Sequence, residues 1–193
     1  MSDYLSKIEG IFDQHEQLLP LVKENCKHDA IQISKAIADA LNKNATLFFC
    51  GNGGSASDSQ HLAAEFIGKF NKIRKPLKAI SLATDTSVLT CISNDFDYDQ
   101  IFSRQIEGLA RPEDVLIVFS TSGESSNIIN ALKVANKLNM LTIAFLGKGG
   151  GVAKEYSKKI ILIPSNSTAR IQEMHIFLGH IICELVESEL GFN

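Results

Sequence analysis

Five short apolar, β-branched runs alternate with segments of helical pattern, and this alternation constrains the fold more than any other feature. The runs are 46–50 (TLFFC), 78–83 (KAISLA), 115–119 (VLIVF), 141–146 (LTIAFL) and 160–163 (IILI). Strands separated by helices are typical of a parallel sheet that is covered on both faces. We therefore expect a three-layer α/β/α sandwich with a five-stranded parallel sheet.

Helical patterns flank these runs at both ends of the chain. Apolar residues at helical spacing predict helices over 3–23 and 28–43, with a break around Glu24 to Lys27, and one long amphipathic helix over 168–190. No linker or low-complexity tract divides the 193 residues. We expect residues 1–193 to form one domain, with 1–44 as a helical pair.

The composition excludes several classes of protein. Hydrophobic residues make up 45% and charged residues 21%, as in soluble globular proteins, and a net charge of -3 gives no reason to expect a nucleic-acid partner. The N-terminus is too polar for a signal peptide, and no run has the roughly 18–20 apolar residues of a membrane span. We expect a cytoplasmic protein whose scattered cysteines are buried free thiols: Cys26, Cys50, Cys91 and Cys183.

Two strand-to-helix junctions are rich in glycine and serine: GNGGSAS at 51–57 and STSGESS at 120–126. Such loops expose backbone N–H groups at a helix N-terminus, and both should emerge at the carboxyl edge of the sheet. The second loop places four hydroxyls in six positions, which suits a phosphate: Ser120, Thr121, Ser122 and Ser125. The alternative is that these serines only cap the next helix.

The first loop also fits the dinucleotide pattern G-x-G-x-x-A through Gly51, Gly53 and Ala56, with Asp85 available for a ribose. A Walker-type loop is excluded because no G-K-[ST] follows Gly51. A dinucleotide site leaves the serine-rich loop unexplained. A sugar phosphate, with one phosphate cradle and polar groups along a short chain, accounts for both loops.

His61 and Glu65 stand one turn apart on the helix that follows the first loop. This spacing suits two metal ligands, or a carboxylate that serves as a general base, or a surface pair without chemistry. On the last helix Gln172 and His180 point to roughly the same side. Periodicity alone does not select His180 over His175.

The motifs GNGGSAS, STSGESS and TARIQEMH, in this order, resemble the sugar isomerase (SIS) domain family, and within it the phosphoheptose isomerases. The resemblance covers essentially the whole chain and implies a flavodoxin-like sheet order. It implies Glu65 as the base, His180 as the second acid/base, and one zinc ion per subunit held by His61, Glu65, Gln172 and His180. It implies further substrate contacts at Asn52, Gly53, Gly54, Ser55, Glu65, Asn94, Asp95, Ser120, Thr121, Ser122, Ser125 and Gln172.

The implied activity is conversion of D-sedoheptulose 7-phosphate to D-glycero-D-manno-heptose 7-phosphate through an enediolate. This is the first step toward ADP- or GDP-heptose for the lipopolysaccharide core or another surface polysaccharide. The resemblance also implies a homotetramer with sites at subunit interfaces. Glu124 departs from the pattern, because the family more often has an amide or a small side chain there. A carboxylate in a phosphate loop repels the ligand unless it points away to solvent.

Three alternatives stay open at this stage. One is a non-catalytic SIS protein that binds the replication initiator; such proteins lack the acid and the histidine found here as Glu65 and His180. Another is a different SIS sugar-phosphate isomerase or sensor, although no helix-turn-helix extension indicates a regulator. The last is a dinucleotide-dependent oxidoreductase.

Overall fold

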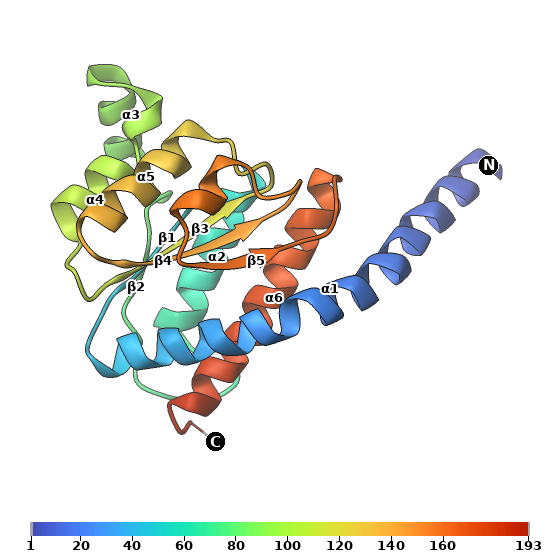
Figure 1. Ribbon diagram of the computed structural model, residues 1–193, viewed down its shortest axis with the longest axis horizontal. Helices are drawn as coiled ribbons and strands as arrows, with labels where there is room; N and C mark the ends of the chain where they lie inside the picture. The colour runs from blue at the N-terminus through green and yellow to red at the C-terminus, as the bar shows by residue number, and fades with distance from the viewer. Residues whose placement is uncertain (1, 193) are drawn as a thin grey trace.

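The computed structural model describes residues 2–192 and contains one parallel sheet (Figure 1). All five predicted strands are confirmed, within two residues at most of their ends. They are β1 (Leu47–Gly51), β2 (Ala79–Ser81), β3 (Val115–Ser120), β4 (Leu141–Leu146) and β5 (Lys159–Leu162).

Helices connect the strands and flank the sheet at both ends of the chain. They are α1 (Ser2–Asn42), α2 (Gly54–Ile67), α3 (Thr86–Asp95), α4 (Ser103–Leu109), α5 (Ser126–Lys137) and α6 (Thr168–Glu189), with short 3-10 turns η1 (Tyr98–Gln100) and η2 (Val152–Tyr156). None of the helices in residues 2–192 has the length and apolar character that crossing a membrane requires.

The strand order is β2-β1-β3-β4-β5, and every neighbouring pair is parallel. This is the flavodoxin-like order, which differs from the 3-2-1-4-5-6 order of dinucleotide-binding sheets. Right-handed crossovers in such a sheet place helices on both faces. The predicted fold class is therefore confirmed, and the topology speaks against the dinucleotide interpretation.

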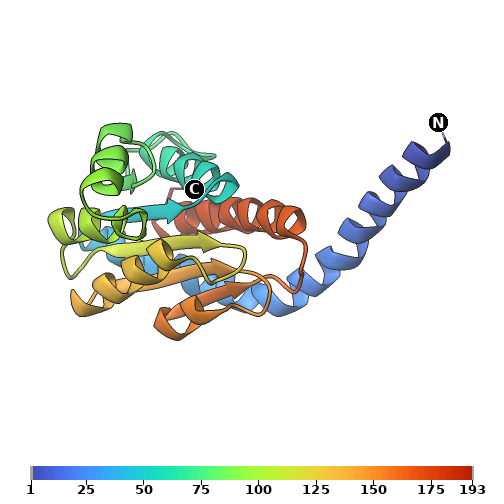
Figure 2. The ribbon, with the colours of Figure 1, turned by 90° about the horizontal axis from the view of Figure 1, so that it is seen from above.

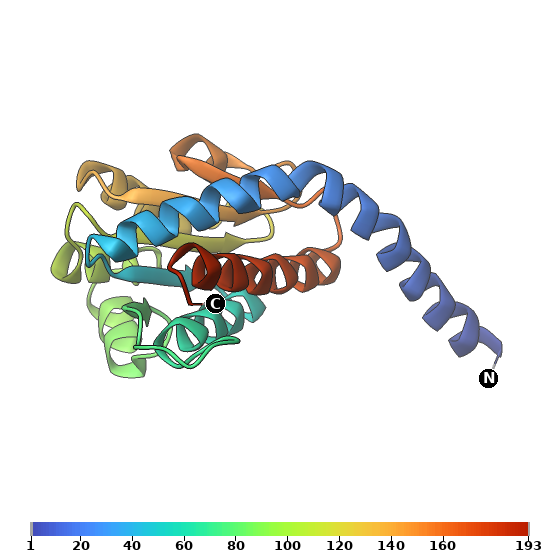
Figure 3. The same ribbon diagram turned by 90° about the horizontal axis from the view of Figure 1, so that it is seen from below.

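Alternate strand residues build the two hydrophobic layers of the sandwich. Phe49, Ile117 and Ile143 face a core that α1, α2 and α6 cover. Phe48 and Leu116 face the opposite core, under α4 and α5. Figures 2 and 3 show the two helical layers on either side of the sheet, with α1 and α6 side by side. Both faces are buried, which is why the strands are continuously apolar.

The predicted break around Glu24 to Lys27 is wrong, because α1 is one continuous helix of 41 residues. Only Cys26 of this polar stretch is buried, and Val22 and Ala30 lie four residues on either side of it against the same core. The apolar stripe therefore runs straight through the segment. Figure 3 shows a bent α1, and the helix contains Pro20, which removes one helical hydrogen bond.

The N-terminal part of α1 projects away from the rest of the molecule (Figures 1 and 2). Its apolar side chains are largely exposed: Tyr4, Leu5, Ile8, Ile11 and Phe12. The cysteines are all free, but Cys91 on α3 is exposed, so the expectation of four buried thiols is wrong for that residue.

Candidate active site at the carboxyl edge of the sheet

The loops after β1 and β3 lie next to each other at the carboxyl edge of the sheet. The register pairs Gly51, the last residue of β1, with Phe119, and Ser120 follows at the end of β3. Helices α2 and α5 begin directly after these loops, and α6 begins after β5 at the same edge. The topology therefore gathers the helix N-termini where open α/β sheets bind ligands.

The glycines of the first loop are required mainly by contacts within the chain. A Cβ on Gly51 would overlap the backbone of Ser55, and a Cβ on Gly54 would lie 2.8 Å from the side-chain amide of Gln172. Gly53 has φ of 56°, in the left-handed region that favours glycine. Of the three, only Gly53 has open space around its Cβ position, which makes it the one suited to close approach by a ligand.

Three polar side chains tie the first loop to neighbouring elements. Asn52 and Asn127 exchange two amide hydrogen bonds of 2.9 Å, and the Tyr98 hydroxyl donates to Asn52 Oδ1 at 3.0 Å. Asn127 is buried in the first turn of α5. Sequence reasoning missed Asn127 and Tyr98, because an asparagine near a helix start and a tyrosine in a polar loop carry no distinguishing pattern.

The serine-rich loop uses some of its hydroxyls to fix its own shape. Ser120 Oγ accepts a hydrogen bond from the N–H of Gly123 at 3.0 Å, and Ser122 Oγ accepts from the N–H of Glu124 at 3.1 Å. Ser125 occupies the N-cap position of α5 but makes no side-chain cap bond. Within residues 2–192 the hydroxyls of Ser125 and Thr121 have no protein partner, so helix capping does not account for the loop.

The exposed side chain of Glu124 is turned toward the neighbouring η2 turn. Its Oε1 accepts a hydrogen bond of 3.1 Å from the N–H of Val152, at the start of η2. The N–H of Ala153 in turn donates to the carbonyl of Gly123 at 2.9 Å. The carboxylate is thus engaged by the neighbouring turn, and the serine-rich loop rests on that turn.

His61, Glu65 and His180 come together from two helices. The Nε2 atoms of His61 and His180 lie 2.9 Å apart, and His61 Nε2 lies 3.3 Å from Glu65 Oε1. One ligand atom from each residue fits within a group in which all separations are at most 4.8 Å. Burial, and then the nearby charge of His61, lower the pKa of His180, while Glu65 acts in the opposite direction. These three residues form a polar cluster, which is a possible metal-binding group.

Gln172 lies elsewhere on α6, with its side-chain amide against Gly54. It therefore contacts the start of α2, whereas His61 and Glu65 lie two and three turns farther along that helix. His175, which the sequence could not separate from His180, is buried against the rings of Phe119 and Phe145. The tertiary structure thus assigns His180 to the polar cluster and His175 to the core.

Asn94 and Asp95 form the exposed end of α3 and contact each other. Asn94 Nδ2 donates to Asp95 Oδ1 at 2.8 Å, and this bond and the Cys91 thiol hold the pKa of Asp95 below its usual value. Within residues 2–192 their side chains make no hydrogen bond to either loop. Their predicted role in substrate binding stays a prediction.

Asp58 is a further acid that sequence reasoning missed. It precedes His61 by one helical turn, and its Oδ2 is buried with no hydrogen-bond partner among the described residues. Burial raises the pKa of Asp58 to about 6, and the charge of His61 partly offsets the effect. The spacing Asp58, His61, Glu65 places all three carboxylate and imidazole groups on one side of α2 and was visible in the sequence.

Comparisons with known proteins agree with this geometry. The family model described as "SIS domain" matches residues 12–147, more than half of the chain. A phosphoheptose isomerase of Clostridium acetobutylicum is 50% identical over 186 residues, which are 96% of this chain and 93% of that protein. The chain belongs to the phosphoheptose isomerase family. Another member of this family, from Akkermansia muciniphila, is 44% identical and covers 98% of both chains.

Solved structures of the phosphoheptose isomerase family have the same fold. The enzyme of Neisseria gonorrhoeae superposes with a TM-score of 0.91 at 36% identity, covering 96% of this chain and 99% of that one. The enzyme of Francisella tularensis gives a TM-score of 0.93 at 31% identity, over 96% and 98% of the two chains. The SIS match ends before α6, but these full-length relatives extend over Gln172 and His180, so the family likeness includes both helices of the polar cluster.

Proposed function

We propose that this chain isomerises D-sedoheptulose 7-phosphate to D-glycero-D-manno-heptose 7-phosphate, as an early step in the synthesis of nucleotide-activated heptose for a surface polysaccharide. The observation that supports this most strongly is the cluster of His61, Glu65 and His180 on helices that start at the same edge as a hydroxyl-rich loop. Relatives at 44–50% identity that are named phosphoheptose isomerase support the substrate.

The reaction moves one proton between C1 and C2 of the sugar. In our proposal Glu65 removes the C1 proton, and the electron pair of the C–H bond forms the double bond of an enediolate between C1 and C2. A proton is then delivered to C2. In our proposal His180 moves the hydroxyl proton from the C1 oxygen to the C2 oxygen, which leaves the aldehyde at C1. Glu65 and His180 are half-buried, so both can face a ligand that approaches from solvent.

The serine-rich loop would bind the phosphate at the far end of the substrate. It precedes the N-terminus of α5, where unpaired N–H groups and the helix dipole favour an anion, and the hydroxyls of Thr121 and Ser125 add donors. Phosphate binding at a distance positions the reacting carbons against Glu65. Glu124 is held by Val152, which limits its repulsion of the phosphate.

The residues present fit a zinc ion. Two imidazole nitrogens and one carboxylate oxygen are the ligand set of many catalytic zinc sites, and they already lie within 4.8 Å of one another. His61, Glu65 and His180 would hold one ion per subunit; Gln172, whose amide lies against Gly54, would have to turn toward them to serve as the proposed fourth ligand. When bound, zinc supplies Lewis-acid polarisation of the sugar oxygens.

We also infer that the protein is a homotetramer whose sites are completed by neighbouring subunits. The exposed apolar side chains of the projecting part of α1 support this, because such a surface is costly in water unless another chain covers it. His61 is half exposed in the single chain, which leaves room for a neighbour at the site. We expect the location to be the cytoplasm, where sugar phosphates are made.

Replacing the proposed base tests the function directly. Glu65→Gln keeps the shape of the side chain but cannot accept the C1 proton, so kcat should fall by about 10³-fold, within the range that general bases contribute. The matched control is Glu184→Gln, an exposed glutamate on α6. Turnover is measured by NMR with sedoheptulose 7-phosphate as substrate, and the oligomeric state by light scattering.

Near-normal turnover of Glu65→Gln would exclude Glu65 as the base. Failure of the wild-type tetramer to turn over sedoheptulose 7-phosphate, with and without added zinc, would exclude the proposed function. In that case the alternative functions to test are a non-catalytic protein that binds the replication initiator and a different SIS sugar-phosphate isomerase.

A further inference from the structure

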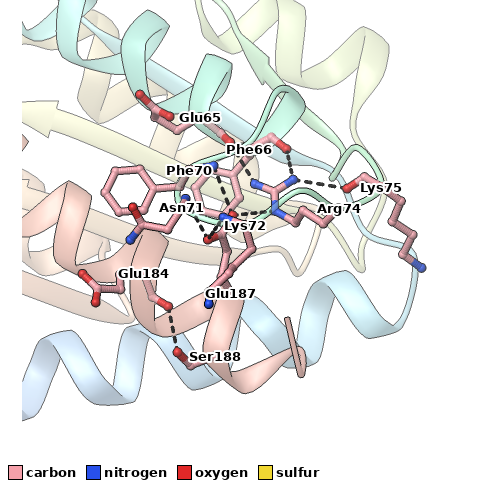
Figure 4. A network of polar contacts seen from close by, with 10 residues as sticks. All are labelled: Glu65, Phe66, Phe70, Asn71, Lys72, Arg74, Lys75, Glu184, Glu187 and Ser188. Atoms are coloured by element: carbon pink, nitrogen blue, oxygen red, sulfur yellow. Dashed lines mark hydrogen bonds and ion pairs between the residues drawn. The ribbon is translucent and has the colours of Figure 1, made fainter. Parts of the chain in front are cut away.

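A buried ion pair joins α6 to the segment that follows α2. Arg74 Nε donates to Glu187 Oε1 at 2.8 Å, and the two side chains are 1% and 4% exposed. Glu187 also accepts the backbone N–H groups of Phe70, Asn71 and Lys72 at 3.0–3.1 Å (Figure 4). Burial acts to raise the pKa of Glu187, but these donors outweigh it and hold the pKa below its ordinary value. The carboxylate is therefore a fully satisfied anion inside the protein.

Arg74 binds the last turn of α2 with the rest of its guanidinium. Nη2 donates to the carbonyl of Glu65 at 2.8 Å, and Nη1 donates to the carbonyl of Phe66 at 2.9 Å. These carbonyls have no partner within the helix, and a cation there is favoured by the helix dipole. One guanidinium thus connects the backbone of Glu65, on α2, to a carboxylate on α6.

The same ion pair sets the position of Phe70. Glu187 holds the backbone N–H of Phe70, and the Phe70 ring stacks on the ring of His180, with centroids 5.5 Å apart and an interplanar angle of 24°. His180 lies on α6, two turns before Glu187. The contacts of Arg74 and Glu187 therefore reach both halves of the polar cluster: the backbone of Glu65 directly, and the ring of His180 through Phe70.

We propose that Arg74 and Glu187 are positioning residues for the His61–Glu65–His180 site, which they hold in register by joining the end of α2 to α6 and by placing Phe70 on the His180 ring. Neither residue touches the three clustered side chains with its own charged group. This inference rests on the proposed function for its catalytic readout, but its metal-binding readout does not need turnover. Groups that orient metal ligands from outside are typically worth 10- to 100-fold in affinity or activity.

The test compares variants of Arg74, Glu187 and Phe70 with a control variant of another buried acid. Arg74→Lys keeps the charge but cannot span Glu187 and two carbonyls, Glu187→Gln keeps the shape, and Phe70→Leu removes only the ring. The control is Asp114→Asn: Asp114 is also buried and also accepts backbone N–H groups, from Thr46 at 2.7 Å and Arg111 at 2.8 Å, but these residues precede β1 and β3, and among residues 2–192 its side chain makes no hydrogen bond to α2 or α6.

Zinc affinity is measured by competition with a chromophoric chelator, kcat and KM with sedoheptulose 7-phosphate, and stability by thermal unfolding. We expect Arg74→Lys and Glu187→Gln to lower zinc affinity and kcat by about 10- to 100-fold, with KM within threefold. Phe70→Leu should lower zinc affinity and kcat by about 5-fold, with an unfolding temperature closer to that of the wild type. Asp114→Asn should lower the unfolding temperature but leave zinc affinity and kcat unchanged.

A purely structural pair would give a different pattern. If Arg74→Lys and Glu187→Gln lose stability as Asp114→Asn does but keep zinc affinity and kcat within twofold, the positioning role is wrong. If both variants fail to fold, Phe70→Leu decides: unchanged zinc affinity and kcat would overturn the proposal. A wild-type chain that binds zinc but lacks isomerase activity refutes the proposed function and leaves the zinc comparison valid.

Discussion

The two ends of the candidate site are built in different ways. The proposed phosphate end is one continuous loop, whose hydrogen bonds from Gly123 to Ser120 and from Glu124 to Ser122 join residues two or three positions apart, and which also rests on the η2 turn through Val152 and Ala153. The reacting end joins His61 and His180, which are 119 positions apart, and depends on the packing of α2 against α6. Part of the loop's shape is therefore fixed by its own residues and part by one neighbouring turn, whereas the reacting end exists only when two helices far apart in the sequence have packed together.

The largest expected effect comes from removing the imidazole that α6 contributes. His180→Gln should lower kcat by about 10²- to 10⁴-fold, since a proton-transfer group is lost, but should leave phosphate binding intact. Turnover and the affinity for inorganic phosphate are measured on the same protein. A parallel loss of phosphate affinity would show that the two ends are not separable.

An intermediate effect is expected from the phosphate end. Ser125→Ala removes a hydroxyl that makes no cap bond, so stability should not change. One hydrogen bond to a charged group is worth about 1.5 kcal/mol, so KM should rise about tenfold while kcat stays within twofold. Ser126→Ala, at the exposed first residue of α5, is the control. A lower unfolding temperature with unchanged KM would make Ser125 a helix cap instead.

The last expected effect is on stability rather than on turnover, and it arises on the helix that carries the reacting end. Burial lowers the pKa of His175 to about 4, although its hydrogen bond to the carbonyl of Leu146 acts in the opposite direction. In the unfolded chain a histidine titrates near pH 6.5, so between about pH 6.5 and 4 the unfolded state binds the extra proton. This histidine therefore makes the protein less stable as the pH falls through that window, by up to about 1.4 kcal/mol per pH unit.

His175→Asn should flatten this pH dependence of the free energy of unfolding, measured by urea titration between pH 5 and 8. His28→Asn, at an exposed position on α1, is the control and should keep the wild-type slope. Equal slopes for wild type and His175→Asn would mean that His175 is protonated in the folded protein. That result would place a charge in the core beside Phe119 and Phe145 and contradict the described packing.

Much of the fold could be predicted from the sequence because it depends on local patterns. Buried parallel strands are continuously apolar, so TLFFC or VLIVF could be recognised without knowing their neighbours. The break around Glu24 to Lys27 was predicted wrongly for the same local reason: three of its four residues are polar, and only contact with the core shows that Cys26 continues the stripe.

The sequence by itself determined the strand and helix alternation, the two small-residue loops and the turn that places His61 beside Glu65. Only the tertiary structure selected His180 over His175, paired Asn52 with Asn127, engaged Glu124 with Val152 and joined Arg74 to Glu187. The physical reason is that periodicity fixes which residues share one face of one element. Which faces of different elements meet is decided by the packing of the whole sandwich.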